Sequence, residues 1–378
     1  MVENTGQEEK AIRRVLQAIS EIKAGGMVIM TDDEDRENEG DLILAASEVC
    51  PEKVNFMAKE ARGLICLTLE AEKVDALQLP MMRSHMNGET PMETAFTVSI
   101  EARNGVTTGI SAADRARTIK VAIDEKTRPE DLVVPGHVFP LKARKGGVLE
   151  RAGHTEGSVD LARLAGKAPA AVICEIMNDD GTMARLPDLE KFAQKFNIPL
   201  VSIADLIVYR LLRETLVEEM IRKPFETPQG RFTGVWFRNL VDRNVHFALI
   251  NQESFESGQC VDVRVQKQNP LGDVFGSGDA NQNDLIDSRW AVDYSLNLLK
   301  TKKAAAVLYL SQPSQQDAML DALEGRQSPM DPRLYGVGAQ MIRSLGIDTM
   351  NLHVRSEKTL KGLHGFGIEI RSMEVMKG

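Results

Sequence analysis

The strongest constraint on the fold of this 378-residue chain is a dense acidic run held between two apolar segments. Seven of the ten residues from Asp32 to Asp41 are acidic, and the apolar segments 27–30 and 42–44 flank the run. Like charges at this density repel one another unless a cation compensates them. Because hard divalent cations prefer carboxylate oxygens, we favour a metal-binding loop between two buried strands over a solvated acidic loop.

The composition is that of a globular protein with two domains. The chain is longer than one typical core supports, and it contains 43% hydrophobic and 27% charged residues. The net charge of −9 argues against nucleic-acid and acidic-membrane partners. Because the sequence has no apolar signal core and no run of 18 apolar residues, we expect a cytoplasmic protein. Its four cysteines contain no CxxC pair and are expected to be reduced thiols.

Residues 1–212 alternate between helical and strand-like segments. This pattern predicts an α/β domain whose sheet is mixed, as in α+β folds. Helical periodicity over 8–24 ends at Gly25 and Gly26. Further helices are expected near Pro51, Ser111, Thr155 and Pro187. Strand-like runs occupy 27–30, 42–46, 64–69, 95–100, 170–177 and 199–203.

The second half of the chain predicts a different α/β domain. A charged, proline-containing segment, 213–226, is interpreted as a linker to a domain at 227–378. In that domain, strands are expected near 233–237, 245–250, 261–266 and 304–310, and helices near 285–299 and 337–345. The two halves show no internal repeat, so we expect two unrelated domains.

The segment 151–157 predicts an anion site where a loop meets a helix. Free backbone N–H groups and the helix dipole attract anions there, while Arg151 offers a guanidinium and Thr155 a hydroxyl. His154 together with Glu37 has the donor types to hold Mg²⁺. The alternative interpretation is an ordinary N-cap threonine beside a surface arginine and a structural histidine.

Two further loops carry candidate residues. His137 lies in a glycine- and proline-flanked stretch after the strand-like segment 133–135, so we expect it to leave a strand end for a cleft. The small-residue loop 105–111, which contains Thr108, is of the kind that wraps oxyanions with backbone N–H groups. It lacks the lysine of a P-loop, and this signal alone is weak.

Glu175 and Cys66 each allow a functional and a structural interpretation. Glu175 lies inside an apolar strand-like run, where burial raises a carboxyl pKa and favours acid–base chemistry. If that strand lies at a sheet edge, Glu175 merely faces solvent. Cys66 is most simply a small buried hydrophobic residue.

Together these segments resemble the 3,4-dihydroxy-2-butanone 4-phosphate synthase family of riboflavin biosynthesis. The resemblance extends in order over about residues 8–212. The segments that carry it are 31–41, 62–66, 94–98, 105–115, 135–140, 151–161 and Glu175 with the following Asn-Asp-Asp-Gly.

The resemblance implies a Mg²⁺-dependent lyase, with Mn²⁺ as an alternative ion, that converts D-ribulose 5-phosphate to L-3,4-dihydroxy-2-butanone 4-phosphate and formate. It implies Glu37 and His154 as metal ligands and a homodimer with sites at the subunit interface. The implied substrate contacts are Arg36, Glu37, Asp41, Thr108, Arg151, Ala152, Gly153, His154, Thr155 and Glu175. The expected catalytic residues are Glu39, Asp41, Cys66, His137 and Glu175, with Asp41 or Glu39 in early proton transfers and Glu175 with His137 in later ones.

Residues 227–378 resemble GTP cyclohydrolase II through 272–277 and 331–340. The zinc cysteines of that family correspond here to Asn269, Ala280 and Gln282, none of which supplies a thiolate. Segment 311–314 also departs from the family pattern. We therefore expect no zinc and no cyclohydrolase activity. Activity through another metal site, or a regulatory or interaction role, are the alternatives. The retained Asp331 and Arg333 either bind a nucleotide or hold a loop.

Overall fold

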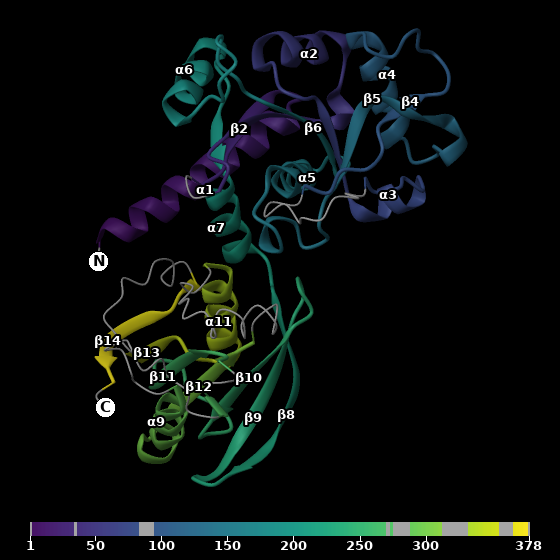
Figure 1. Ribbon diagram of the computed structural model, residues 1–378. Helices are drawn as coiled ribbons and strands as arrows, with labels where there is room; N and C mark the ends of the chain where they lie inside the picture. Colours follow the sequence, from purple (N-terminus) through teal and green to yellow (C-terminus); the bar gives the residue numbers. More distant parts are fainter. Residues whose placement is uncertain are drawn as a thin grey trace, which may run out of the picture. The chain divides into compact units, whose positions relative to one another are not determined.

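The computed structural model describes residues 2–33, 36–82, 94–269, 273–274, 288–311, 332–354 and 366–376 (Figure 1). Gln7–Tyr209 forms one compact unit, and Arg210–Gly378 forms most of a second one. Each unit contains a seven-stranded mixed sheet with helices, which confirms the predicted α/β class. Among the described residues, no helix is both long enough and apolar enough to cross a membrane.

The sheet of the first unit has the strand order β4-β5-β3-β6-β2-β1-β7. The pairs β3–β5 and β1–β7 are parallel, and the remaining neighbours are antiparallel. The strands are β1 (Met27–Thr31), β2 (Gly40–Ala45), β3 (Cys66–Leu69), β4 (Ile100–Ala102), β5 (Leu132–Lys142), β6 (Ala170–Glu175) and β7 (Leu200–Ser202).

Helices cover both faces of this sheet, with α2 and α4 on one side and α5 and α7 on the other (Figure 1). In β2, Leu42 packs into the core beneath α2 and α4, and its neighbour Ile43 packs into the core beneath α1, α5 and α7. Burial on both faces explains why the strands read as continuous apolar runs. The helices are α1 (Val2–Lys23), α2 (Pro51–Phe56), α3 (Ala71–Ala76), α4 (Ala112–Ile123), α5 (His154–Leu164), α6 (Leu186–Phe196) and α7 (Ile203–Arg213).

Two local predictions for the first unit are wrong. The segment 95–100 does not form one continuous strand. It contains isolated bridges at Phe96 and Thr97, and the short β4 begins only at Ile100. His137 does not follow a strand end, since it lies in the middle of β5. Pro135 and Gly136 resemble a strand terminator in the sequence, yet β5 continues through them and pairs with β4 and β3 on its two sides.

The sheet of the second unit has the order β14-β13-β11-β12-β10-β9-β8. Its apolar cores lie beneath α11 (Pro332–Ser344) on one face and α9 (Ser288–Thr301) on the other. The strands are β8 (Val217–Thr227), β9 (Gly230–Asn239), β10 (Val245–Ile250), β11 (Cys260–Lys267), β12 (Ala305–Leu310), β13 (Thr349–Val354) and β14 (Glu369–Val375).

The predicted linker 213–226 is wrong, because most of it is the edge strand β8, which pairs with β9 along its length. Most side chains of β8 are exposed, and an edge strand tolerates a proline such as Pro224. Exposure and proline together gave this strand the appearance of a linker.

Candidate active site

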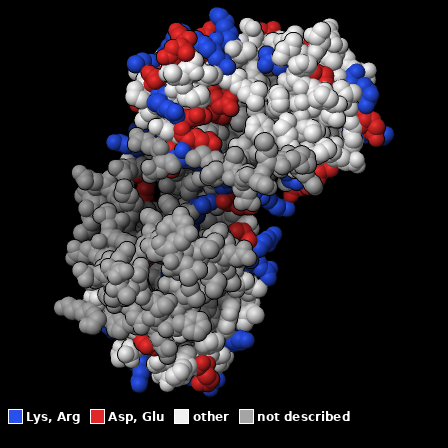
Figure 2. Space-filling view, in the orientation of Figure 1, with Lys and Arg blue, Asp and Glu red and all other residues white. Residues whose placement is uncertain are grey.

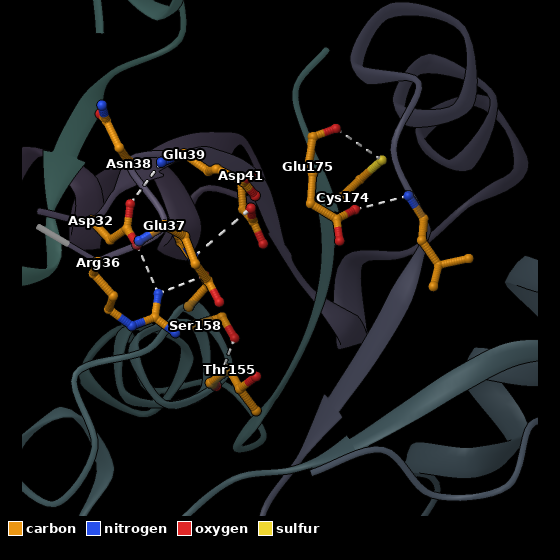
Figure 3. Close-up of polar contacts among 12 residues, drawn as sticks. Asp32, Arg36, Glu37, Asn38, Glu39, Asp41, Thr155, Ser158, Cys174 and Glu175 are labelled. Carbon is orange, nitrogen blue, oxygen red and sulfur yellow. Dashed lines mark hydrogen bonds and ion pairs between the residues drawn. The ribbon is translucent and has the colours of Figure 1, made fainter. Parts of the chain in front are cut away.

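The acidic residues gather at one end of the first sheet, where three elements meet. The acidic loop 32–39 joins β1 to β2, and residues 34 and 35 lie outside the described part. Asp41 at the start of β2 pairs directly with Glu175 at the end of β6, and α5 begins nearby with His154. Figure 2 shows the acidic side chains of this region gathered on one face, and Figure 3 shows their contacts. Residues 134 positions apart thus form one carboxylate-rich group.

His154 faces this carboxylate group. Its Nδ1 lies 3.8 Å from Oε2 of Glu37 and 4.0 Å from Oδ1 of Asp41. The residue is only 6% exposed, and among the described residues its buried Nε2 has no hydrogen-bond partner. Nδ1 is the ring nitrogen that faces the carboxylates, so it is the one placed to share a cation with Glu37. Donor atoms of Asp32, Glu37 and His154 lie within 4.8 Å of one another, and these residue types fit a divalent cation.

The crowding shifts the proton affinities of these groups. Burial raises the pKa of Asp41 to about 7, and burial also raises that of Glu39. The His154 contact, helped by Arg36, lowers the pKa of Glu37 to about 2. Burial disfavours the charged form of His154, but Asp41 and Glu37 more than offset it and raise its pKa. The site therefore attracts positive charge, either a proton or a metal ion.

The start of α5 offers backbone donors beside this group. Gly153 is the N-cap and provides no side-chain cap, so the interpretation of Thr155 as the N-cap is wrong. Thr155 is buried in the first turn, and Ala152 packs against the core. Arg151 Nη1 donates to Oε2 of the buried Glu156 at 2.7 Å, in the space that a Cβ on Gly153 would need. The anion site predicted at 151–157 stays a prediction, since the guanidinium that it would use pairs with Glu156 in this structure.

Glu175 is anchored at the end of a central strand. Its Oε2 accepts a hydrogen bond from the N–H of Leu64 at 2.8 Å, and its carbonyl accepts one from Gly63 at 3.1 Å. A Cβ on Gly63 would lie 2.4 Å from that carbonyl oxygen, so the close approach requires glycine. Because β6 lies between β3 and β2, the edge-strand interpretation of Glu175 is wrong.

Comparison with known proteins identifies the family. Residues 16–209 match the profile of 3,4-dihydroxy-2-butanone 4-phosphate synthase, and residues 218–375 match that of GTP cyclohydrolase II. The chain belongs to the 3,4-dihydroxy-2-butanone 4-phosphate synthase family. It carries a GTP cyclohydrolase II-like second domain.

Several relatives match this chain across both of its domains. A riboflavin biosynthesis protein, RibBA, of Synechocystis is 46% identical over 93% of this chain, which spans 66% of that protein. A protein named 3,4-dihydroxy-2-butanone 4-phosphate synthase from Neisseria meningitidis is 42% identical over 96% of this chain and 98% of its own length. The crystal structure of a two-domain synthase from A. baumannii superposes with a TM-score of 0.76 at 39% identity, covering 96% of this chain and 99% of that one.

His137 and Thr108 form a second group in this synthase domain. His137 Nδ1 lies 2.7 Å from Oε2 of Glu101, whose Oε1 accepts a hydrogen bond from Thr118 at 2.9 Å. Thr108 is exposed in a loop whose neighbours, Thr107 and Gly109, donate backbone N–H groups to Asp114. Among the described residues, no hydrogen bond or ion pair joins this group to His154.

Cys66 links the two groups only through the sheet. It pairs with Phe139 of β5 and with Ile173 of β6, so His137 and Glu175 each lie two residues from its neighbours, towards the same end of the sheet. Cys66 is buried, and burial raises the pKa of its thiol. This environment favours the neutral thiol, and a catalytic role for Cys66 stays a prediction.

Sequence reasoning missed Asp32, Glu101 and Arg185 as functional candidates. Glu101 carries the signal that identified Glu175, a carboxylate inside an apolar strand. Arg185 precedes α6 and donates to the backbone of the acidic loop, which nothing in its local sequence indicates. Asp32 was hidden among its acidic neighbours.

Proposed function

We propose that this protein converts D-ribulose 5-phosphate to L-3,4-dihydroxy-2-butanone 4-phosphate and formate with a divalent cation. The observation that carries this proposal is the buried His154, whose Nδ1 faces the carboxylates of Glu37 at 3.8 Å and Asp41 at 4.0 Å. The family membership supplies the reaction class. The carboxylate-rich surroundings supply the chemistry that such a reaction needs.

Glu37 and His154 would hold the metal ion, Mg²⁺ or alternatively Mn²⁺. When bound, the ion stabilises negative charge that develops on substrate oxygens. The phosphate would be recognised at the start of α5, by the backbone N–H groups of His154 and Thr155, the Thr155 hydroxyl and the guanidinium of Arg151, which would exchange its contact with Glu156 for the phosphate. Arg36 would contact the substrate from the acidic loop, where its guanidinium now pairs with Asp32 and Glu37.

Proton transfers would use the remaining carboxylates. A pKa of about 7 lets Asp41 accept and return a proton near neutral pH, and the raised pKa of Glu39 favours the same use. These two residues are the candidates for the early enolisation. Glu175, opposite Asp41, would serve in later steps together with His137, which Glu101 orients.

A homodimer would bring the two groups of residues together. His137 and Thr108 lie close in sequence to two exposed apolar side chains. Val134 is 53% exposed and Ile110 is 56% exposed. A second copy that covers this surface would place His137 of one subunit near His154 of the other. Mixing His137→Ala and His154→Ala subunits tests this arrangement. Recovery of activity in the mixture supports shared sites, and failure of the mixture to recover argues for sites within one subunit.

The second domain would lack cyclohydrolase activity. Asn269 occupies the position of one zinc cysteine, while Ala280, Gln282 and Asp331 lie outside the described residues. After Tyr209 the sequence contains one cysteine, Cys260, which cannot form a three-cysteine zinc site by itself. Incubation with GTP and Zn²⁺ tests this point. Pyrophosphate release would show that the domain has retained the activity.

The synthase activity is tested with ribulose 5-phosphate and Mg²⁺. Formate and the four-carbon phosphate should appear in equal amounts, and EDTA should abolish both. Glu37→Ala and His154→Ala serve as inactive controls. Wild-type turnover in either variant would refute the metal assignment, and absence of formate from the native protein would refute the proposed function.

A further inference from the structure

Asp32 lies at the end of β1 and has an almost fully buried side chain, only 1% exposed. Both of its oxygens accept hydrogen bonds from the acidic loop. Oδ1 accepts the N–H of Glu39 at 2.7 Å, and Oδ2 accepts the N–H of Glu37 at 3.0 Å. Oδ2 also pairs with Nη1 of Arg36 at 2.7 Å. Figure 3 shows this carboxylate on the inner side of the loop. The Asp32 side chain therefore contacts Arg36, Glu37 and Glu39.

A second side chain, Arg185, holds carbonyl groups of the same loop and shares the Asn38–Glu39 peptide with Asp32. Arg185, just before α6, donates to the carbonyl of Glu37 at 2.8 Å and to the carbonyl of Asn38. Asn38 turns the backbone through the left-handed region with φ 54°, which asparagine tolerates. The N–H groups of Glu37 and Glu39 thus point to Asp32, and the carbonyls of Glu37 and Asn38 point to Arg185. This fixes the backbone from which the Glu37 and Glu39 side chains project.

Burying another carboxylate beside Glu37, Glu39 and Asp41 costs stability unless it is used. The hydrogen bonds show the use, because backbone donors and Arg36 already occupy both oxygens of Asp32. Those contacts leave Glu37 and His154 as the better placed ligands for a cation. We propose that Asp32 is a positioning residue, which sets the orientation of Glu37 and Glu39 for metal binding and proton transfer without touching the substrate. This inference rests on the proposed function.

The test compares Asp32→Asn with Asp33→Asn. Asp33 is exposed and adjacent, so both variants remove one negative charge from the same loop. Only Asp32→Asn places an amide NH₂, itself a donor, next to groups that donate to Asp32 in the native protein. We expect it to weaken Mn²⁺ binding, measured by electron paramagnetic resonance of free Mn²⁺, by about tenfold or more, and to lower kcat by about 10-fold to 100-fold. Its thermal unfolding should remain a single cooperative transition, and Asp33→Asn should change neither Mn²⁺ binding nor kcat.

Native Mn²⁺ affinity and kcat in folded Asp32→Asn would overturn the inference, as would an equal loss in Asp33→Asn, since charge alone would then explain it. If Asp32→Asn does not fold, Arg185→Gln replaces it, because Arg185 holds the carbonyls of Glu37 and Asn38 in the same loop. Native affinity and kcat in Arg185→Gln would then overturn the inference. The Mn²⁺ titration needs no turnover, so its outcome is separate from whether ribulose 5-phosphate is the substrate.

Discussion

Each of the two units contains a cluster of one aspartate, one glutamate and one histidine. The clusters differ in which histidine nitrogens already have a hydrogen-bond partner. Asp32, Glu37 and His154 form the first, and Asp262, His353 and Glu374 form the second, each with donor atoms within 4.8 Å of one another. His154 keeps one buried nitrogen without a partner among the described residues. His353 uses both nitrogens, with Tyr294 at 2.9 Å and Asp262 at 2.8 Å.

The charge balance differs as well. In the second cluster, Nζ of Lys302 lies 3.0 Å from Asp262 and 3.9 Å from Glu374, so a protein cation already occupies the space between the carboxylates. In the first cluster, Nη1 of Arg36 also lies between two carboxylates, 2.7 Å from Asp32 and 2.6 Å from Glu37, but the nearby Glu39 and Asp41 add further acidic groups. Composition alone therefore does not identify a metal site. Two features distinguish the first cluster from the second: an unpartnered histidine nitrogen and an excess of negative charge.

The largest effect should come from Glu37→Gln. This change keeps the size of the side chain and removes the charge that attracts a cation. We expect the rate of formate release to fall by about 10²-fold to 10³-fold and Mn²⁺ binding to be lost. His353→Asn is the matched control in the second cluster and should leave both quantities unchanged. Equal losses in the two variants would show that the clusters do not differ as described.

The second cluster should respond in stability. Asp262→Asn removes the charge that pairs with Lys302 and His353 beneath α9, and the free energy of unfolding should fall by about 2 kcal/mol. Urea unfolding measures the change, while formate release reports on the first unit. A loss of synthase activity in the folded variant, with unfolding unchanged, would contradict the structural role assigned to this cluster.

The sequence singled out more of the residues that meet at the site than of the contacts between them. The acidic run and segment 151–157 identified Glu37 and His154, because charge density and helix-start residues are local signals. The pairing of Asp41 with Glu175 is set by strand register, which local sequence does not encode. Strand β8 was not predicted, because an exposed edge strand lacks the alternation of apolar residues by which strands are predicted. Arg185 holds the acidic loop from 147 positions away along the chain, a contact that only the fold reveals.

A smaller effect should separate the metal cluster from the His137 group. Glu101→Gln weakens the contact that orients His137 but does not touch the carboxylates around His154. We expect kcat to fall by about tenfold, with native Mn²⁺ affinity. His137→Asn should lose at least as much, and the double variant should lose little more. Additive losses would show that Glu101 acts independently of His137.

The smallest effect should come from Lys302→Met. This variant tests whether the unpartnered histidine nitrogen or the excess of negative charge distinguishes the first cluster. Removing the lysine gives the second cluster the excess of negative charge but leaves both nitrogens of His353 engaged by Tyr294 and Asp262. If an unpartnered donor is required, Mn²⁺ should still bind only at the first cluster, and the titration should keep the native number of sites. A new site in Lys302→Met that is absent from Lys302→Met with Asp262→Asn would show that charge alone separates the clusters. The orphaned nitrogen of His154 would then be a consequence of its negative surroundings rather than the feature that selects the metal.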